Sequence, residues 1–100
     1  MPSTDTPHGL DQVTVIIVTY DSAHCIEALS RALVDLPHVT VVDNASRDGT
    51  PDKVAQLMPW ARLIVNSENL GFGTANNQGL HSVTTRYALL LNPDCHITPE

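Results

Sequence analysis

An acidic residue placed directly after an apolar run is the first candidate for chemistry in this sequence. The run at 89–91 is followed by Asn92, Pro93 and Asp94. Proline fixes its own backbone angle and so restrains the direction of the residue beside it. One carboxylate at a strand end, with substrate phosphates and water, is a common way to hold Mg²⁺ or Mn²⁺. The triplet is also favourable in turns, so locally Asp94 is either a metal ligand or a turn residue.

Two other polar clusters, each after an apolar run, carry side chains that suit a nucleotide. Thr19 and Tyr20 follow the first run, and a tyrosine there can pack on a nucleobase or be a half-buried core residue. Asp43 and Asn44 follow the second run. A carboxylate there can accept hydrogen bonds from a ribose hydroxyl or a base N–H, or it can cap a helix or form an Asx turn.

The densest polar stretch is 69–79. Gly71 and Gly73 precede an expected helix, where glycine lets the backbone approach a ligand and free N–H groups favour phosphate. Asn76 and Asn77 stand inside this helix despite poor helix propensity, and such local misfits are more often functional than accidental. The third glycine of the dinucleotide fingerprint is missing and the stretch follows the third apolar run, which argues against a dehydrogenase.

Alternating strands and helices must position these clusters. The apolar runs predict strands over 13–19, 39–43, 61–66 and 86–92. Caps and amphipathic spacing predict helices at about 22–36, 50–58 and 74–83. This β-α-β-α-β-α-β order predicts an α/β fold, an open parallel sheet with flanking helices. Such sheets bind ligands outside the carboxyl ends of their strands, so all the clusters are expected at one edge.

Composition limits the classes of function. One hundred residues make one domain, and the net charge is −6 with its five Lys and Arg residues scattered singly. A nucleic-acid interface and a polybasic membrane patch are therefore not expected, and no run is long enough to be a transmembrane segment. Residues 1–12 are polar and predict a disordered leader. The five histidines share no metal-ligand spacing, and Cys25 and Cys95, with no pairing motif, are expected as free thiols in a reducing cytosol.

Four motifs together resemble the family-two glycosyltransferases, most closely their rhamnosyltransferase-like branch. They are V-T-V-I-I-V-T-Y at 13–20, V-V-D-N-A-S-x-D-G-T at 41–50, N-x-G-F-G-x-A-N-N-x-G at 69–79 and L-L-L-N-P-D at 89–94. The resemblance covers about residues 13–98. It implies the Rossmann-like GT-A nucleotide-sugar-binding fold, with 13–100 as its truncated N-terminal, donor-binding part.

The resemblance also implies roles for individual residues. Thr19, Tyr20 and Asp43 would hold the nucleoside, and the 76–79 turn of helix would lie beside the diphosphate. The triplet 92–94 stands where the family carries Asp-x-Asp.

In that triplet Asn92 replaces the first aspartate, and Asp94 matches the position that binds the divalent metal, Mg²⁺ or Mn²⁺. Family members invert the anomeric configuration, and their general base would come from a segment beyond Glu100. The donor would be dTDP-rhamnose or a UDP-sugar, and the acceptor a glycan or lipid-linked saccharide. The 100-residue chain would then supply donor binding alone.

Several expectations accompany this interpretation. The protein would act in cell-wall or polysaccharide biosynthesis, in the cytoplasm or at the inner face of the membrane. An apolar sheet edge left exposed would favour a homo-oligomer. Two rival interpretations remain: a nucleotide-sugar-binding module without catalysis, and a receiver-like domain with Asp43 as phospho-acceptor. The second rival lacks the expected acidic pair after the first strand, and the only lysine is Lys53.

Overall fold

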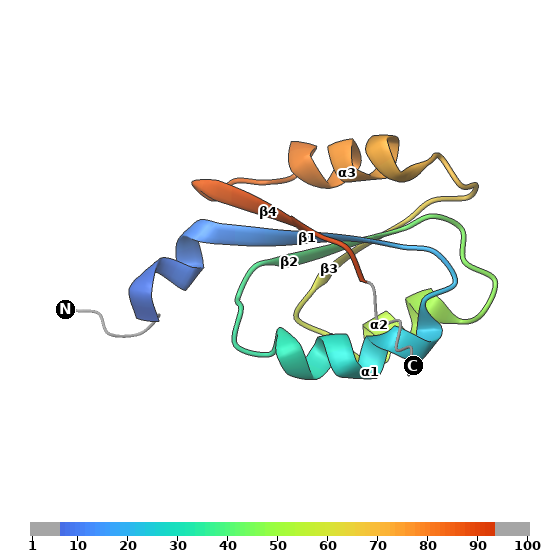
Figure 1. Ribbon diagram of the computed structural model, residues 1–100, viewed down its shortest axis with the longest axis horizontal. Coiled ribbons are helices and arrows are strands. Elements are labelled where there is room, and N and C mark those ends of the chain that lie inside the picture. Colours follow the sequence, from blue (N-terminus) through green and yellow to red (C-terminus); the bar gives the residue numbers. More distant parts are fainter. Residues whose placement is uncertain (1–6, 94–100) are drawn as a thin grey trace, which may run out of the picture.

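The structure is a computed structural model that describes residues 7–93. Its centre is one sheet of four parallel strands in the order β3-β2-β1-β4. The strands are β1 (Val13–Thr19), β2 (Val39–Asp43), β3 (Arg62–Val65) and β4 (Tyr87–Leu91). All four carboxyl ends lie at the same edge (Figure 1). The predicted open parallel α/β sheet is therefore confirmed.

Three helices cover the two faces of the sheet. They are α1 (Ala23–Ala32), α2 (Thr50–Leu57) and α3 (Phe72–His81). Helices α1 and α2 lie on one face and α3 lies alone on the other (Figure 1). The predicted first helix was too long, because Leu33 already caps α1 by donating its N–H to Leu29 O at 2.9 Å.

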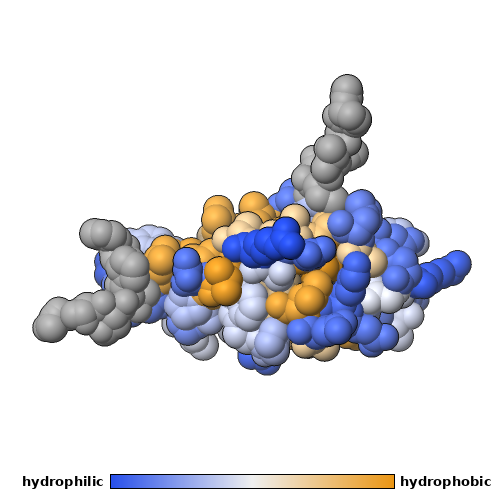
Figure 2. All heavy atoms as spheres, turned by 90° about the horizontal axis from the view of Figure 1, so that it is seen from below, coloured by the Kyte–Doolittle hydropathy of each residue, from blue (hydrophilic) through white to orange (hydrophobic). Residues whose placement is uncertain are grey.

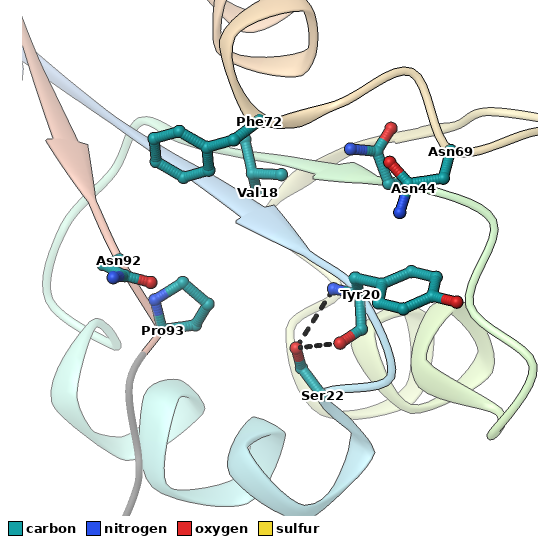
Figure 3. A pocket seen from close by; sticks show the side chains of 8 residues that line it. All are labelled: Val18, Tyr20, Ser22, Asn44, Asn69, Phe72, Asn92 and Pro93. Carbon is teal, nitrogen blue, oxygen red and sulfur yellow. Dashed lines mark hydrogen bonds between the residues drawn. The ribbon is translucent and has the colours of Figure 1, made fainter.

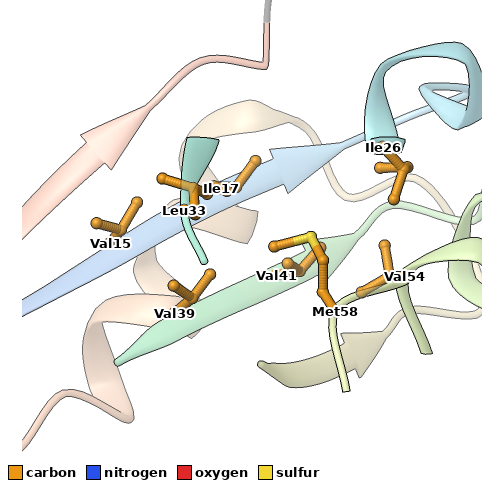
Figure 4. Packing of buried hydrophobic residues seen from close by; sticks show 8 residues of the cluster. All are labelled: Val15, Ile17, Ile26, Leu33, Val39, Val41, Val54 and Met58. Atoms are coloured by element: carbon orange, nitrogen blue, oxygen red, sulfur yellow. The ribbon is translucent and has the colours of Figure 1, made fainter. Parts of the chain in front are cut away.

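The core occupies both faces of the two central strands, which explains their unbroken apolar runs. On the α1 and α2 side, eight buried side chains form one cluster (Figure 4). They are Val15, Ile17, Ile26, Leu33, Val39, Val41, Val54 and Met58. On the α3 side a smaller cluster joins Val18 and Val42 to Ala75. Strands β1 and β2 are thus held from both sides, and their ends form a rigid base for a site.

The part of the segment before β1 that the structure describes is helical. Residues 7–12, expected within a disordered leader, form the 3-10 helix η1 (Pro7–Gln12). Pro7 has a backbone angle suited to starting a helix, and η1 packs against β1. Residues 1–6 and 94–100 lie outside the described part of the chain.

Strand β4 is an edge of the described sheet and carries exposed apolar side chains. Tyr87, Leu89 and Leu90 are 56%, 52% and 47% exposed, whereas the neighbouring Ile16 of β1 is fully buried. From the α1 and α2 side, apolar surface lies in patches divided by polar surface (Figure 2). No helix within residues 7–93 is long and apolar enough to cross a membrane.

Candidate functional site

A hollow of about 410 Å³, called here the first hollow, opens at the carboxyl edge of the sheet. Its wall draws on the ends of β1, β2 and β4 and on the start of α3 (Figure 3). The lining residues are Val18, Tyr20, Ser22, Asn44, Asn69, Phe72, Asn92 and Pro93. Three of the predicted binding residues, Tyr20, Asn44 and Asn92, are therefore brought together here.

A second hollow of about 500 Å³ adjoins the first. It is lined by 45–47 after β2, by the last residue of β3 and the loop that follows it (65–69), and by Tyr20. Tyr20 and Asn69 belong to the walls of both hollows. The ring of Tyr20 is 49% exposed, so it is a surface of the site and not a core residue. Two adjoining hollows with a shared aromatic wall suit an extended ligand that has a flat group.

The turn after β1 holds Tyr20 through its backbone. Ser22 Oγ accepts a hydrogen bond from Tyr20 N and donates one to Tyr20 O, both at 3.1 Å (Figure 3). Ser22 is 7% exposed and lines the first hollow. The position of the aromatic ring therefore depends on a local hydroxyl contact.

Thr19 and Asp43, which were predicted to hold the nucleoside, are completely buried and contact each other. They are neighbours in the register of β1 and β2, and Thr19 Oγ1 donates to Asp43 Oδ1 at 2.7 Å. Ser46 donates from Oγ to Asp43 Oδ1 at 2.6 Å and from N to Oδ2 at 2.9 Å. The Asp43 carboxylate thus closes the turn after β2, and neither residue lines a hollow.

The binding residues predicted before and within α3 lie in different environments in the structure. Asn76 is 6% exposed and Asn77 lies on the exposed side of the helix. Gly71 adopts a φ of +89°, which favours glycine, and it directly precedes α3. None of these three residues lines either hollow. Two neighbours that the sequence analysis did not select, Asn69 and Phe72, do so instead. Phe72 could have been noticed, since it is an aromatic residue within a polar, glycine-containing stretch and can offer a flat face to a ligand.

Hydrogen bonds from backbone N–H groups to side-chain oxygens connect two loops along the site. Asp21 N donates to Ser46 Oγ at 2.7 Å, and Arg47 N donates to Asp21 Oδ1 at 2.8 Å. Asp21 and Ala45 have positive φ angles, +48° and +65°, which non-glycine residues rarely adopt. Such conformations persist only where surrounding contacts hold them, and they cluster at functional sites.

The carboxylate of Asp48 accepts hydrogen bonds from backbone N–H groups in the first turns of two helices. Its Oδ2 accepts from Ala23 N at 3.0 Å at the start of α1, and its Oδ1 accepts from Thr50 N at 3.1 Å at the start of α2. Thr50 Oγ1 also donates to Oδ1 and accepts from Ser22 N at 3.0 Å. Partial burial, the largest single influence, raises the pKa of Asp48, but these hydrogen bonds together bring it below its ordinary value of 3.8.

We therefore expect Asp48→Ala to lower the free energy of unfolding by about 1 kcal/mol at pH 7, as for the loss of a helix cap. Because the folded pKa is depressed, the stabilisation is present above the ordinary pKa and is lost as pH falls through the folded value. Urea unfolding at pH 7 and pH 3 measures this. A difference from wild type that persists or grows at pH 3 would contradict the assignment.

The described residues do not by themselves form a metal site. Within residues 7–93 no group of three His, Cys, Asp or Glu side chains could hold a metal ion. The buried carboxylate of Asp43 is already taken up by hydrogen bonds. Asp94, the predicted metal ligand, lies outside the described residues; Pro93, which precedes it in the sequence, lines the first hollow.

One prediction about the cysteines was wrong. Cys25 is 2% exposed and is disulfide-bonded, whereas a free thiol was expected. Its Sγ lies 3.6 Å from Pro93 O. Sequence spacing could not reveal this, because pairing depends on which segments the fold brings together. Cys95 lies outside the described residues.

Comparison with known proteins gives a consistent result. The family model described as Glycosyl transferase family 2 matches residues 14–100. The succinoglycan biosynthesis protein ExoO of Rhizobium meliloti is 34% identical over 102 residues, covering 94% of this chain and 29% of the relative. The N-acetylglucosaminyl-diphospho-decaprenol L-rhamnosyltransferase of Mycobacterium tuberculosis is 39% identical over 72 residues, covering 68% of this chain and 24% of the relative. The low-salt glycan biosynthesis hexosyltransferase Agl10 of Haloferax volcanii is 30% identical, covering 91% of this chain and 30% of the relative. The chain thus spans about a quarter to a third of the length of these relatives.

Proposed function

The chain belongs to glycosyl transferase family 2, and from this premise we propose that it binds the nucleoside diphosphate part of a nucleotide-activated sugar. The observation that carries the proposal is the pair of adjoining hollows at the carboxyl edge, with the half-exposed ring of Tyr20 in the walls of both. Parallel α/β sheets bind nucleotides at this edge.

The chemistry of the walls suits such a donor. Tyr20 and Phe72 are exposed aromatic side chains, and each offers a face for a nucleobase or sugar ring. Asn69 and Asn92 are exposed amides that both donate and accept, as ribose and sugar hydroxyls require. Among the described residues no acidic side chain lines the first hollow, so it places no carboxylate against a diphosphate.

The relatives narrow the donor and the acceptor that we propose. The Mycobacterium tuberculosis relative is named for rhamnosyl transfer to a diphospho-decaprenol substrate. We accordingly favour dTDP-rhamnose or a UDP-sugar as donor and a glycan or lipid-linked saccharide as acceptor, in cell-wall or polysaccharide biosynthesis. The acceptor hydroxyl attacks the anomeric carbon with inversion, the nucleoside diphosphate departs, and a base beyond Glu100 in a longer protein takes the proton.

Further parts of the proposal rest on the family resemblance. Asp94 is the ligand that we assign to Mg²⁺ or Mn²⁺, which when bound would stabilise charge on the leaving diphosphate. The location is the cytoplasm or the inner face of the membrane, near a lipid-linked acceptor. The exposed apolar edge on β4 favours self-association.

A second candidate function is a binding module that does not catalyse transfer. It is favoured by the described lining of the first hollow, whose aromatic and amide side chains serve binding. Adding donor and acceptor to the chain separates the two: released nucleoside diphosphate with a glycosylated acceptor shows transfer, and binding alone supports the module.

We expect UDP or dTDP to bind the chain, and Tyr20→Ala to weaken that binding by about fivefold to 150-fold, because stacking on an aromatic ring contributes about 1–3 kcal/mol. NMR titration with each nucleotide, with and without Mg²⁺ or Mn²⁺, measures it. Tyr87→Ala is the matched control, since Tyr87 is similarly exposed at the opposite end of the sheet.

Three outcomes of this titration decide the proposal. Binding lost in Tyr20→Ala and kept in Tyr87→Ala supports it. A metal-dependent increase in affinity that disappears in Asp94→Ala supports the assigned ligand. Wild-type spectra that are dispersed and respond to neither nucleotide would overturn donor binding.

A further inference from the structure

Three amide side chains at the site form one hydrogen-bonded unit, in which Asn44 lines the first hollow and Asn66 lines the second. Asn66 and Gln78 pair reciprocally: Asn66 Nδ2 donates to Gln78 Oε1 at 2.8 Å, and Gln78 Nε2 donates to Asn66 Oδ1 at 2.9 Å. Asn66 Nδ2 also donates to Asn44 Oδ1 at 3.0 Å. The unit therefore connects the ends of β2 and β3 with the middle of α3. We call it the amide network.

The network continues into the backbone of the loop before α3. Asn44 Oδ1 also accepts from Leu70 N at 3.2 Å, and Asn44 Nδ2 donates to Gly71 O at 3.1 Å. One amide thus fixes two consecutive residues through both of its polar atoms. The residues on either side of this pair, Asn69 and Phe72, line the first hollow.

We propose that Asn44, Asn66 and Gln78 are positioning residues, which set the Asn69 and Phe72 wall of the first hollow for its ligand. The expected effect on ligand affinity rests on the proposed nucleotide-binding function. Figure 3 shows Asn44 beside the loop that carries Asn69.

The burial and geometry of the network favour positioning over direct contact. Asn44 is only 2% exposed, and its amide is engaged by three hydrogen bonds. Gln78 lines neither hollow, so it can influence a ligand only through its partners. Asn66 Nδ2 donates to both Gln78 Oε1 and Asn44 Oδ1, so both N–H groups of this amide are used within the network and not for a ligand.

The loop itself offers few alternative restraints. Leu70 is 38% exposed, so apolar burial does not hold it. Gly71 has a left-handed φ of +89°, and its N–H donates within the loop to Asn69 Oδ1 at 2.8 Å. Besides the backbone bond from Ala75 N to Gly71 O at 3.1 Å, the side chain of Asn44 makes the hydrogen bonds that tie this turn to the end of the sheet, and Asn66 and Gln78 in turn hold Asn44.

The test begins with Gln78→Leu in the whole chain, followed by NMR and by titration with UDP and dTDP. Gln78 contacts neither Leu70 nor Gly71 in the network, so a change at their backbone signals reports transmission through the other two amides. We expect faster hydrogen exchange of Leu70 N–H, shifted Gly71 signals and a Kd raised about fivefold to tenfold, the equivalent of one hydrogen bond.

Two further variants make the test specific. Gln78→Glu keeps the side-chain shape and the acceptor for Asn66 Nδ2 but loses the donor, so it should give a smaller change of the same kind even if Gln78→Leu folds poorly. His81→Leu is the control, because His81 is an exposed residue at the end of α3 that lines neither hollow, and it should leave the loop signals and the Kd unchanged.

The outcomes separate this inference from the proposed function. A loss of thermal stability in Gln78→Leu with wild-type Leu70 exchange and wild-type Kd would overturn the positioning role. If wild type binds neither nucleotide, the proposed function fails, while the Leu70 and Gly71 signals still test whether the network holds the loop.

Discussion

Asp43→Ala is expected to lower the free energy of unfolding by about 2–4 kcal/mol, because three partly or fully buried donors lose their acceptor. In the wild-type chain, three donors bond to the Asp43 carboxylate: Thr19 Oγ1 and the N and Oγ of Ser46. Asp43 and Thr19 have no solvent exposure. Water cannot readily replace the carboxylate at Thr19. Urea unfolding monitored by circular dichroism measures the loss.

Two controls define what Asp43 does. Asp43→Asn should have a smaller effect, since the amide keeps the size and one acceptor but offers an NH₂ group to donors on its other side. Asp35→Ala removes an exposed carboxylate and should change stability little. If Asp43→Ala were as stable as wild type but no longer bound nucleotide, direct ligand contact would replace the structural role.

Gly79→Ala is expected to destabilise the chain by about 1–3 kcal/mol through overpacking. A Cβ at this position would lie 2.6 Å from Cγ2 of Ile16, which is completely buried. Ile16 is held between its register partners Thr40 and Leu90, so the methyl group has little room to retreat. Alanine favours helices over glycine by about 1 kcal/mol, so the clash must exceed this gain to appear as a net loss.

Gly73→Ala in the same helix provides the matched control. A Cβ added at Gly73 would meet no atom within 4 Å, so we expect unchanged or slightly raised stability from the better helix propensity. Thermal unfolding of both variants gives the comparison. Equal melting temperatures for Gly79→Ala and Gly73→Ala would show that α3 can move away from β1 without cost.

Local chemistry predicted the architecture well for identifiable reasons. β-Branched, uninterrupted runs are typical of strands covered on both faces, and β1 and β2 are such strands. Parallel strands bring their polar ends to one edge, which is why Tyr20, Asn44 and Asn92 meet in one wall. These inferences need only the order and periodicity of the residues.

Which polar residues face a hollow and which ones hold its walls depends on distances that a sequence does not contain. The register of β1 and β2 sets Thr19 beside Asp43, where the two satisfy each other below the surface. The pairing of Asn66 with Gln78 likewise requires α3 to lie at one height over the sheet. Polar type alone could not separate residues that face a hollow from residues that hold its walls.

The strand order has a consequence for how the site comes into being during folding. Strand β1 pairs with β2, which is near in the chain, and with β4, where Val13 meets Tyr87 across almost the whole described length. Closing so long a loop costs more conformational entropy than closing a short one, and contacts between residues far apart in the chain therefore form more slowly. The walls contributed by β1 and β2 can therefore assemble early, whereas Asn92, just beyond β4, joins them last. A chain emerging from the ribosome would possess the Tyr20 surface before it possesses a complete site.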